Sequence, residues 1–174
     1  MAITIIATAG SATANSFITL VEAETYMLGR GNKTLWDAAT DAAKDITLAE
    51  ATQEIDLRCF IGRRTDSTQA LDWPRQDATN PDDPILSLFD TDVVPTRIKN
   101  ATAELAFQFH KAGTTDLAAI DAKANVKRKQ VDVLETEYFA SSTTPSGLAR
   151  FPRVMGYIRP LLANAGLSTQ VIRG

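Results

Sequence analysis

The most regular hydrophobic pattern in the chain lies in residues 95–111, where apolar side chains recur at three- and four-residue spacing. That spacing places them on one face of a helix. The face consists of Ile98, Ala101, Thr102, Leu105, Ala106 and Phe109. Pro95 suits the first turn, because its missing N–H would have no partner there, and Gly113 tolerates the left-handed backbone that ends a helix. Phe107 lies off this face, so the pattern predicts a central helix that is covered on more than one side.

Three helical segments are predicted before the central helix. Thr19 and Glu22 have the spacing of a capping box, which opens a helix that continues to about Leu28. Residues 33–39 predict a short helical turn, and a longer helix is expected over residues 41–60. The buried side of this longer helix is expected to hold Ile46 or Leu48, Ala51, Thr52, Ile55 and Cys59. Acidic residues occupy much of the remainder, which is typical of a solvated face.

The segments after the central helix differ in character. Residues 117–122 predict a short helical turn, whereas residues 126–139 alternate as a strand does. Residues 141–147 are rich in Ser, Thr, Pro and Gly, which indicates a loop. The last helix is expected over residues 152–163, and Pro160 should kink or divide it because proline cannot donate the helical hydrogen bond.

The longest irregular region covers residues 63–94, and loops of this length are usually functional, partner-bound or poorly ordered. It contains Trp73, whose backbone is extended because Pro74 follows it. We interpret Trp73, Pro74 and Arg75 as an anchor that pins the loop to the helical core, with a ligand-stacking role as the less favoured alternative. Residues 1–15 carry no charge, and we expect either a short strand or an arm that is ordered only against a partner.

Together these patterns predict a mainly α fold. It is a compact helical bundle around one central helix, with a long loop, a small β-strand or hairpin element and extended N- and C-terminal arms. The 174 residues fit a single domain. Its expected parts are an N-terminal arm or strand (1–15), a helical body (16–163) with the loop 63–94 and the strand region 126–139, and a C-terminal arm (164–174).

Composition changes this picture little, but the charges are unevenly distributed. The chain is 44% hydrophobic and 22% charged with a formal net charge of −3, which is ordinary for a globular protein. Residues 1–122 carry 10 Lys and Arg against 18 Asp and Glu, whereas residues 123–174 carry 8 against 3. Either the two parts meet different surroundings, so that one copy's tail meets another copy's body, or the charges cluster by chance on a solvated surface.

Several classes of protein are disfavoured by the sequence. No apolar run approaches the roughly 18–20 residues that a membrane span needs. Residues 1–6 have no basic residue before their short apolar run, which argues against a secretory signal. Cys59 is the only cysteine, so it forms no internal disulfide, as expected for folding in a reducing cytoplasm. Among apolar helix residues, Cys59 is expected to be a small core residue.

The sequence predicts no enzyme, no metal site and no cofactor. It contains no Gly-rich phosphate loop, no Cys/His metal spacing and no Gly-x-Ser-x-Gly elbow. The single histidine, His110, lies near a helix end, where the helix dipole favours a surface or half-buried residue over a general base. Asp82 and Asp83 lie in a Pro- and Asp-rich loop with no basic or histidine neighbour in sequence, and such pairs are usually exposed to solvent.

The basic cluster of Lys127, Arg128 and Lys129 has two interpretations. Lys and Arg on an edge strand discourage aggregation. Alternatively, the cluster is a phosphate-facing patch that holds or guides DNA without reading its sequence. Three charges on one chain bind weakly, but repeated around a ring they would make a continuous positive collar. Tyr138 and Phe139 lie nearby in sequence, and exposed aromatics beside basic residues are what single-stranded-DNA binding requires.

Several short motifs, taken in order, resemble one known family. The motifs are Ala14-Asn15-Ser16-Phe17-Ile18-Thr19-Leu20-Val21-Glu22-Ala23 with Tyr26, Trp36, Ala49-Glu50-Ala51-Thr52-Gln53-Glu54-Ile55-Asp56, Gly62-Arg63-Arg64-Thr65-Asp66, Gln69-Ala70-Leu71-Asp72-Trp73-Pro74-Arg75, Val94-Pro95, Ala101-Thr102-Ala103-Glu104-Leu105-Ala106 and Val171-Ile172-Arg173-Gly174. The chain resembles the head–tail connector (adaptor) proteins of tailed bacteriophages, a group also labelled DnaT-like single-stranded-DNA-binding proteins. The Trp-Pro-Arg loop and the Val-Ile-Arg-Gly segment are the most specific of these motifs.

The resemblance implies a mainly helical subunit that forms a ring, usually of twelve copies, under the portal protein at the capsid vertex. Such a ring extends the DNA channel and gives the tail or a stopper protein a docking surface. Non-specific contact with packaged DNA follows from that position, and some of Lys127, Arg128 and Lys129 are expected to project toward the channel. The implied location is the neck of the virion, after synthesis in the host bacterial cytoplasm and without a membrane partner.

In related adaptors a C-terminal segment reaches the portal, so the resemblance implies a docking arm in residues 167–174. The residues expected to dock are Leu167, Val171, Ile172 and Arg173. Val171 and Ile172 would be costly on a free tail, so we expect them to pack or pair with a neighbour. The alternative function, from a different class of protein, is a single-stranded-DNA-binding module.

Overall fold

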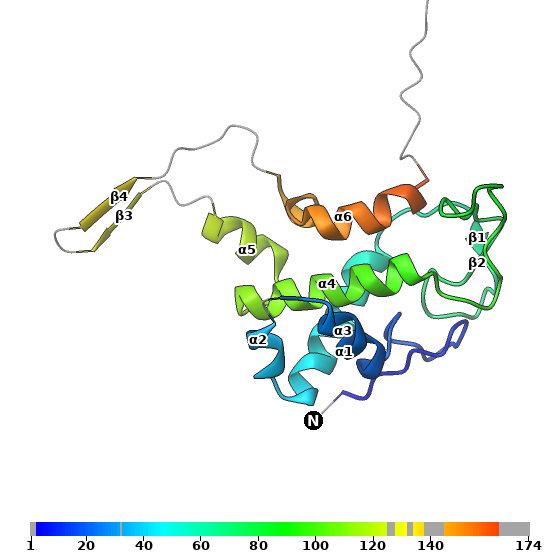
Figure 1. Cartoon of the computed structure of the whole chain (residues 1–174), viewed down its shortest axis with the longest axis horizontal. Coiled ribbons are helices and arrows are strands. Elements are labelled where there is room, and N and C mark those ends of the chain that lie inside the picture. The colour runs from blue at the N-terminus through cyan, green and yellow to red at the C-terminus, as the bar shows by residue number, and fades with distance from the viewer. Residues whose placement is uncertain (1–2, 32, 125–127, 132–133, 138–144, 164–174) are drawn as a thin grey trace, which may run out of the picture.

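The structure, a computed structural model, describes residues 3–31, 33–124, 128–131, 134–137 and 145–163. This part of the chain is mainly helical, with two short antiparallel strand pairs (Figure 1). The elements in chain order are α1 (Leu20–Leu28), α2 (Thr34–Asp37), α3 (Asp41–Asp56), β1 (Arg63–Arg64), β2 (Arg75–Gln76), α4 (Thr96–Ala112), α5 (Leu117–Ala124), β3 (Arg128–Val131), β4 (Leu134–Glu137), η1 (Gly147–Arg150), α6 (Pro152–Ile158) and η2 (Arg159–Leu161). The predicted helical fold class is therefore confirmed.

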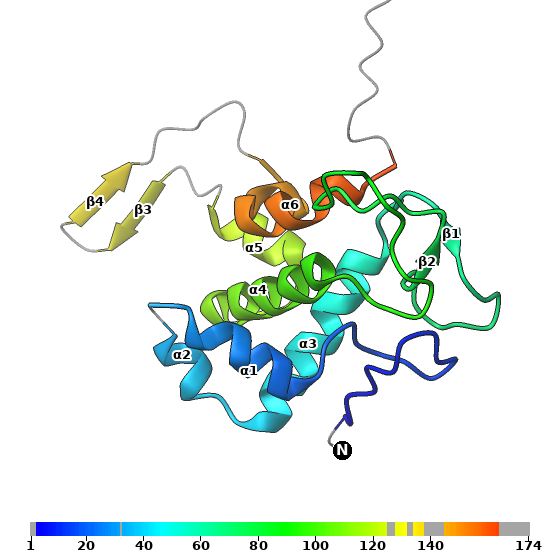
Figure 2. The ribbon, with the colours of Figure 1, turned by 45° about the vertical axis from the view of Figure 1, so that its right-hand side comes forward.

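The helix α4 is the central helix that the sequence predicts. Pro95 precedes its first turn, and Gly113 ends it with a left-handed φ of 68°. The helices α1, α2, α3 and α6 all pack on it, and Figures 1 and 2 show it between α6 and the pair α1 and α3. Its buried side chains are Ile98, Ala101, Thr102, Ala103, Glu104, Leu105, Ala106, Phe107 and Phe109. Because more than one side of α4 is covered, the hydrophobic core forms around this helix.

The helices before α4 begin where the capping signals predict. The Thr19 hydroxyl accepts a hydrogen bond from the Glu22 backbone N–H at 3.2 Å, and the Glu22 carboxylate accepts one from the Thr19 N–H at 3.0 Å. This is the predicted capping box at the start of α1. Trp36 on α2 is buried in the core. Thr40 caps α3 by accepting a hydrogen bond from the Ala43 N–H.

The helix α3 buries one side against α4. Of the two candidates for its first core position, Leu48 is buried and Ile46 is exposed. The predicted core positions Ala51, Thr52 and Ile55 are also buried. The acidic face is only partly solvated, because Asp56 at the helix end is half-buried. Its carboxylate accepts a hydrogen bond of 2.7 Å from the Asp72 backbone N–H, and this bond joins α3 to the following loop.

The end of α3 differs from the prediction in a way that exposes Cys59. The helix ends at Asp56, not at Phe60. Beyond it the backbone pairs with the end of the helical body: Ala163 N–H donates to Cys59 C=O at 2.9 Å, and Phe60 forms an antiparallel bridge with Leu162. Helical spacing no longer applies to this segment, so Cys59 is exposed and its expected core position is wrong.

Residues 63–94 contain more regular structure than the sequence predicts. The strands β1 and β2 pair antiparallel, with Arg64 opposite Arg75. A further antiparallel bridge joins Thr79 to Leu88. In Figures 1 and 2 this region forms a folded lobe at the end of the molecule where α4 begins.

The described N-terminal residues 3–15 fold back on their own chain. Ile6 N–H donates to the side-chain oxygen of Asn15 at 2.7 Å, and Asn15 N–H donates back to Ile6 C=O at 2.9 Å. Ala70 N–H donates to Ser11 C=O at 3.1 Å, which connects this segment to the loop region. The predicted short strand does not form there, and contacts within the chain order the segment without a partner.

The C-terminal half of the helical body follows the sequence pattern closely. Pro160 divides the predicted last helix into α6 and η2, as expected. The strands β3 and β4 form an antiparallel hairpin in which Arg128 lies opposite Glu137. Both ribbon views show this hairpin beyond α5, at a distance from the other helices (Figures 1 and 2). The predicted C-terminal arm, residues 164–174, lies outside the described residues.

Gly62 and Gly113 form a matched pair for testing the loop backbone. Both have a positive φ, of 73° and 68°. A Cβ at Gly62 would lie 2.5 Å from the Gln76 carbonyl oxygen, whereas a Cβ at Gly113 would meet nothing within 4 Å. We expect Gly113→Ala to lower the free energy of unfolding by about 1 kcal/mol, and Gly62→Ala by about 2 kcal/mol or more. Urea denaturation of both variants measures this difference, and equal losses would contradict the predicted clash.

Candidate functional site

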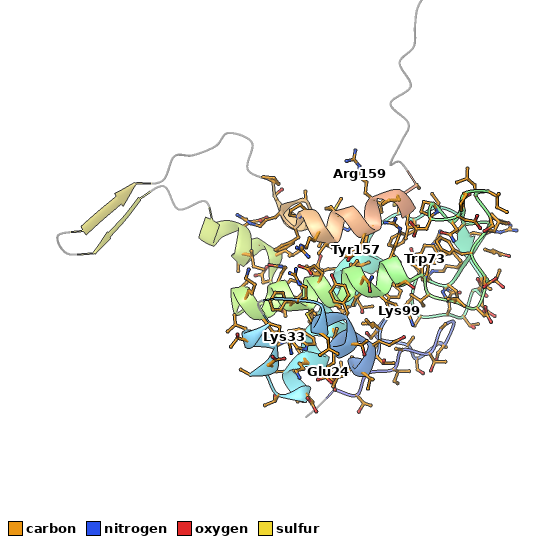
Figure 3. All side chains as sticks on the ribbon, in the orientation of Figure 1. Glu24, Lys33, Trp73, Lys99, Tyr157 and Arg159 are labelled. Atoms are coloured by element: carbon orange, nitrogen blue, oxygen red, sulfur yellow. The ribbon has the colours of Figure 1, made fainter. Side chains whose placement is uncertain are left out.

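A buried polar cluster joins α1, α4 and α6. The carboxylate of Glu104 on α4 accepts hydrogen bonds from Arg30 Nη2 at 2.8 Å, Tyr26 Oη at 3.2 Å and Gln108 Nε2 at 3.0 Å. The Tyr157 hydroxyl on α6 lies 3.3 Å from the Tyr26 hydroxyl and extends the cluster. Figure 3 shows Tyr157 between α6 and α4. The side chain of Glu104 is only 1% exposed, so its charge depends on these partners.

The chemistry of this cluster suits a helix junction. Burial, the hydrogen bond with Tyr157 and the charge of Glu104 raise the pKa of Tyr26, so its phenol stays neutral at physiological pH. The guanidinium of Arg30 also lies 5.4 Å from the centre of the Phe107 ring. Paired charges and a neutral phenol stabilise the positions of three helices on one another.

A surface groove of about 350 Å³ lies beside this cluster, between α1 and the first turns of α4. Lys99 Nζ donates to Glu22 Oε1 at 2.5 Å across it. Burial raises the pKa of Glu22, but the hydrogen bonds from Lys99 and Thr19 outweigh it and lower the pKa overall. The lining residues are Ile18, Val21, Glu22, Thr25, Tyr26, Thr96, Lys99 and Asn100. Because its charges are paired, the groove offers mainly apolar and neutral polar contacts.

Large apolar side chains are exposed on several parts of the described surface, and two of these parts are the helix α1 and the loop before α4. On the outer side of α1, Val21 and Leu28 are each 73% exposed. In the loop before α4, the exposed side chains are Ile85, Leu86, Leu88 and Val93. Exposed apolar groups gathered in one loop are typical of a surface that another protein covers.

The Trp-Pro-Arg motif lies against the core through its aromatic ring. Trp73 is buried, and its peptide bond to Pro74 is cis. Its ring meets Phe60 and Phe89 edge to face, with centroid distances of 5.7 and 5.6 Å. Figure 3 shows Trp73 where the loop region meets the helical body. These contacts attach the loop to the core and leave no ring face of Trp73 open to a stacked ligand.

Arg75 provides the polar part of the same attachment. Its guanidinium donates to the backbone carbonyls of Phe60 at 3.3 Å, Ile61 at 2.8 Å and Gly62 at 2.7 Å. It also lies 3.3 Å from the carboxylate of Asp72. Arg75 is therefore committed to fixing the chain after α3, because all of these bonds are internal.

Two of the three residues of the basic cluster lie in a described strand. Arg128 and Lys129 belong to β3, and Lys129 lies opposite Thr136 on β4. Lys127 lies outside the described residues, as do Tyr138 and Phe139. The structure therefore brings two members of the cluster onto one hairpin.

His110 lies half-buried near the end of α4, as the sequence predicts. Its Nε2 lies 3.0 Å from the Thr47 hydroxyl, and its ring meets Trp36 edge to face. Burial and the nearby Lys44 ammonium lower the pKa of His110 below its usual value of 6.5. Burial and the Lys44 charge therefore outweigh the helix dipole, which by itself favours a charged histidine at the end of a helix.

The lowered pKa of His110 predicts a pH-dependent stability. Below about pH 6.5 the unfolded chain takes up this proton more readily than the folded chain, so the free energy of unfolding falls as the pH falls. Above that pH this contribution is fully present. We expect His110→Gln to flatten the decrease between pH 7.5 and pH 5, as measured by urea denaturation at each pH. A variant with the same pH dependence as the unmodified protein would contradict this.

In the part of the chain that the structure describes, no group of three His, Cys, Asp or Glu side chains is placed to hold a metal ion. Within the same residues, none of the helices has the length and hydrophobicity to cross a membrane.

The whole chain, residues 1–174, matches the model of one family, described as "Putative DnaT-like ssDNA binding protein". The chain belongs to this DnaT-like family. The family label implied by the sequence motifs is thereby confirmed. No curated protein and no solved structure is detectably similar to the chain.

Sequence reasoning missed two features of this DnaT-like protein. The buried carboxylate of Glu104 was not predicted, because the prediction for α4 considered only its apolar face. An acidic residue between Ala103 and Leu105, in the helix expected to be covered on more than one side, was the available signal. The exposed loop was missed because residues 85–88 were treated as part of an irregular region. Their signal was an apolar run bounded by aspartates, which is unusual for a solvated loop.

Proposed function

We propose that this chain is a non-enzymatic structural subunit of a phage neck. It forms a ring that joins the portal to the tail or a stopper protein and lines the DNA channel. The resemblance of the sequence motifs supports the phage context. The exposed apolar loop supports assembly, because side chains such as Ile85 and Leu88 are costly in water and are stabilised when another protein covers them. The virion neck is the proposed location.

The family description favours a second candidate, a single-stranded-DNA-binding module. Binding without sequence preference uses exposed aromatic side chains on which bases stack, beside basic residues that follow the phosphates. Wherever the structure describes their side chains, the Phe, Trp and Tyr residues are buried or half-buried. A stacking surface would therefore have to use Tyr138 and Phe139, beside the basic cluster. For this reason we place the ring subunit first.

Native mass spectrometry of the purified chain, alone and mixed with portal rings, tests the proposal. A closed ring, or a monomer that assembles on the portal, is the expected result. A chain that stays monomeric, ignores portal rings and binds short oligonucleotides would replace the ring subunit by the DNA-binding module.

Two variants test whether the C-terminal arm and the basic cluster make the proposed contacts. Deletion of residues 167–174 removes Leu167, Val171, Ile172 and Arg173, and is expected to prevent heads from joining tails. Normal joining would remove this arm from the proposal. Neutralising Lys127, Arg128 and Lys129 is expected to leave the ring intact while weakening its salt-sensitive affinity for DNA. An unchanged affinity would remove these residues from the channel lining.

A further inference from the structure

The loop of residues 77–93, here called the acidic loop, exposes apolar side chains to an unusual extent. Ile85 is 84% exposed, Leu86 62% and Leu88 57%. Val93 near its end is also exposed. A protein that buries a complete core around α4 gains nothing from keeping these four groups in water, so their exposure calls for a partner.

The acidic loop is held in one conformation by its own hydrogen bonds. Asn80 N–H donates to Ser87 C=O at 2.7 Å, and Ile85 N–H donates to the Asp83 carboxylate at 3.0 Å. Leu86 has a positive φ of 51°, which is strained for a leucine and is maintained by surrounding contacts. The acidic loop is therefore already ordered before it binds, so docking costs little conformational entropy.

The charge of the acidic loop indicates the chemistry of its partner. Residues 77–93 contain five Asp and no Lys or Arg. Asp82 pairs with Arg97 and Asp77 with Arg63. Asp90 and Asp92 are exposed and have no ion-pair partner among the described residues. A surface that covers this loop should therefore supply positive charge beside an open apolar or small-residue patch.

The outer side of α6 and η2 has this chemistry. Arg153 and Arg159 are exposed, and neither has an ion-pair partner within the described chain. Figure 3 shows Arg159 pointing away from the helical body. Between them lies Gly156, where an added Cβ would meet nothing within 4 Å. Pro152 and Pro160 are also exposed. The result is an open surface with a cationic side chain near each end.

We propose that the acidic loop of one copy docks on the α6 surface of a second copy. Ile85, Leu86 and Leu88 would cover the open patch around Gly156, and the free carboxylates of the loop would meet the two free arginines. Two different surfaces meet in this contact, so it is heterologous and can repeat from copy to copy around a ring. The inference rests on the proposed function and identifies the surfaces that neighbouring subunits share.

Gly156→Glu is the first test, with Gly31→Glu as its matched control. Both glycines have open space where a side chain would be added, and Gly156→Glu improves helix propensity, so the variant should fold. Analytical ultracentrifugation of the full chain is expected to show Gly156→Glu raising the apparent dissociation constant of self-association about tenfold or more. Gly31→Glu is expected to leave it unchanged. Equal effects of the two variants would overturn the proposal, as would an unmodified chain that stays monomeric at its solubility limit.

A charge exchange tests the pairing of the two surfaces directly. Asp90→Arg/Asp92→Arg and Arg153→Asp/Arg159→Asp should each fail to self-associate. Their mixture should assemble, because each variant restores the complementarity that the other lost. No assembly of the folded mixture overturns the proposal. An arginine variant that assembles normally but loses affinity for an oligothymidylate probe also overturns it, and marks α6 as a nucleic-acid surface.

The outcomes separate this inference from the proposed function. Rings that form despite all of these substitutions remove the contact between the acidic loop and α6 but leave the ring subunit in place. A chain that is monomeric alone and assembles only on portal rings also removes this contact and leaves the ring subunit in place. A chain that assembles in neither setting contradicts both proposals.

Discussion

Arg30→Met is expected to lower the free energy of unfolding by about 3 kcal/mol or more, because it leaves the Glu104 carboxylate buried without its cationic partner. The Arg30–Glu104 pair is 2.8 Å long, and Glu104 is almost completely inaccessible. The remaining partners of Glu104 are the neutral Tyr26 hydroxyl and the Gln108 amide, and neither compensates for a buried negative charge. Urea denaturation monitored by circular dichroism measures the loss.

Two comparisons show whether this effect comes from the buried pair. Lys33→Met removes the exposed Lys33–Asp37 pair and is expected to cost less than about 0.5 kcal/mol. The double variant Arg30→Met/Glu104→Met replaces the buried charges by apolar groups and should recover most of the lost stability. A stability of Arg30→Met close to that of Lys33→Met would contradict this account of the helix junction.

Trp73→Ala is expected to destabilise the protein by about 3–5 kcal/mol, because it creates a cavity between Phe60 and Phe89 where a large aromatic ring was buried. The loss of edge-to-face contacts with both rings adds to the cost. Thermal or chemical unfolding measures the change. The near-ultraviolet circular dichroism of the folded variant reports whether its aromatic packing has loosened.

The control for this prediction is a large-to-small substitution at an exposed site. Leu57 is 73% exposed at the end of α3, so Leu57→Ala is expected to change stability by no more than about 0.5 kcal/mol. If Trp73→Ala were as mild as Leu57→Ala, the Trp73 ring would not be what attaches the loop to the core.

Local patterns predicted the helical part of this fold because the signals are contained within a few residues. The capping box at Thr19, the periodicity of α4 and the division of the last helix at Pro160 all depend on neighbours in sequence. The position of Cys59 could not be predicted in this way. Its exposure depends on backbone pairing with Ala163, about a hundred residues away.

In the candidate site, too, local features could be predicted from the sequence, whereas contacts between distant residues could not. A tryptophan before proline indicates an anchor, but the three carbonyls that Arg75 contacts lie 13 to 15 residues earlier in the chain. Two of the three partners of Glu104, Tyr26 and Arg30, lie 78 and 74 residues earlier in the chain. Contacts of this kind depend on how helices pack, and no spacing along the sequence encodes them.

The pairing of residues 59–61 with residues 161–163 has a consequence for synthesis. Ile61 N–H donates to Leu161 C=O, and Ala163 N–H donates to Cys59 C=O, both at 2.9 Å. A nascent chain therefore cannot complete the base of its loop region until almost the whole described sequence has left the ribosome. The exposed Ile85 and Leu88 are then finally positioned only after residues 161–163 have been synthesised. A premature translation stop before residue 161 should yield a product that is degraded and is not built into an assembly.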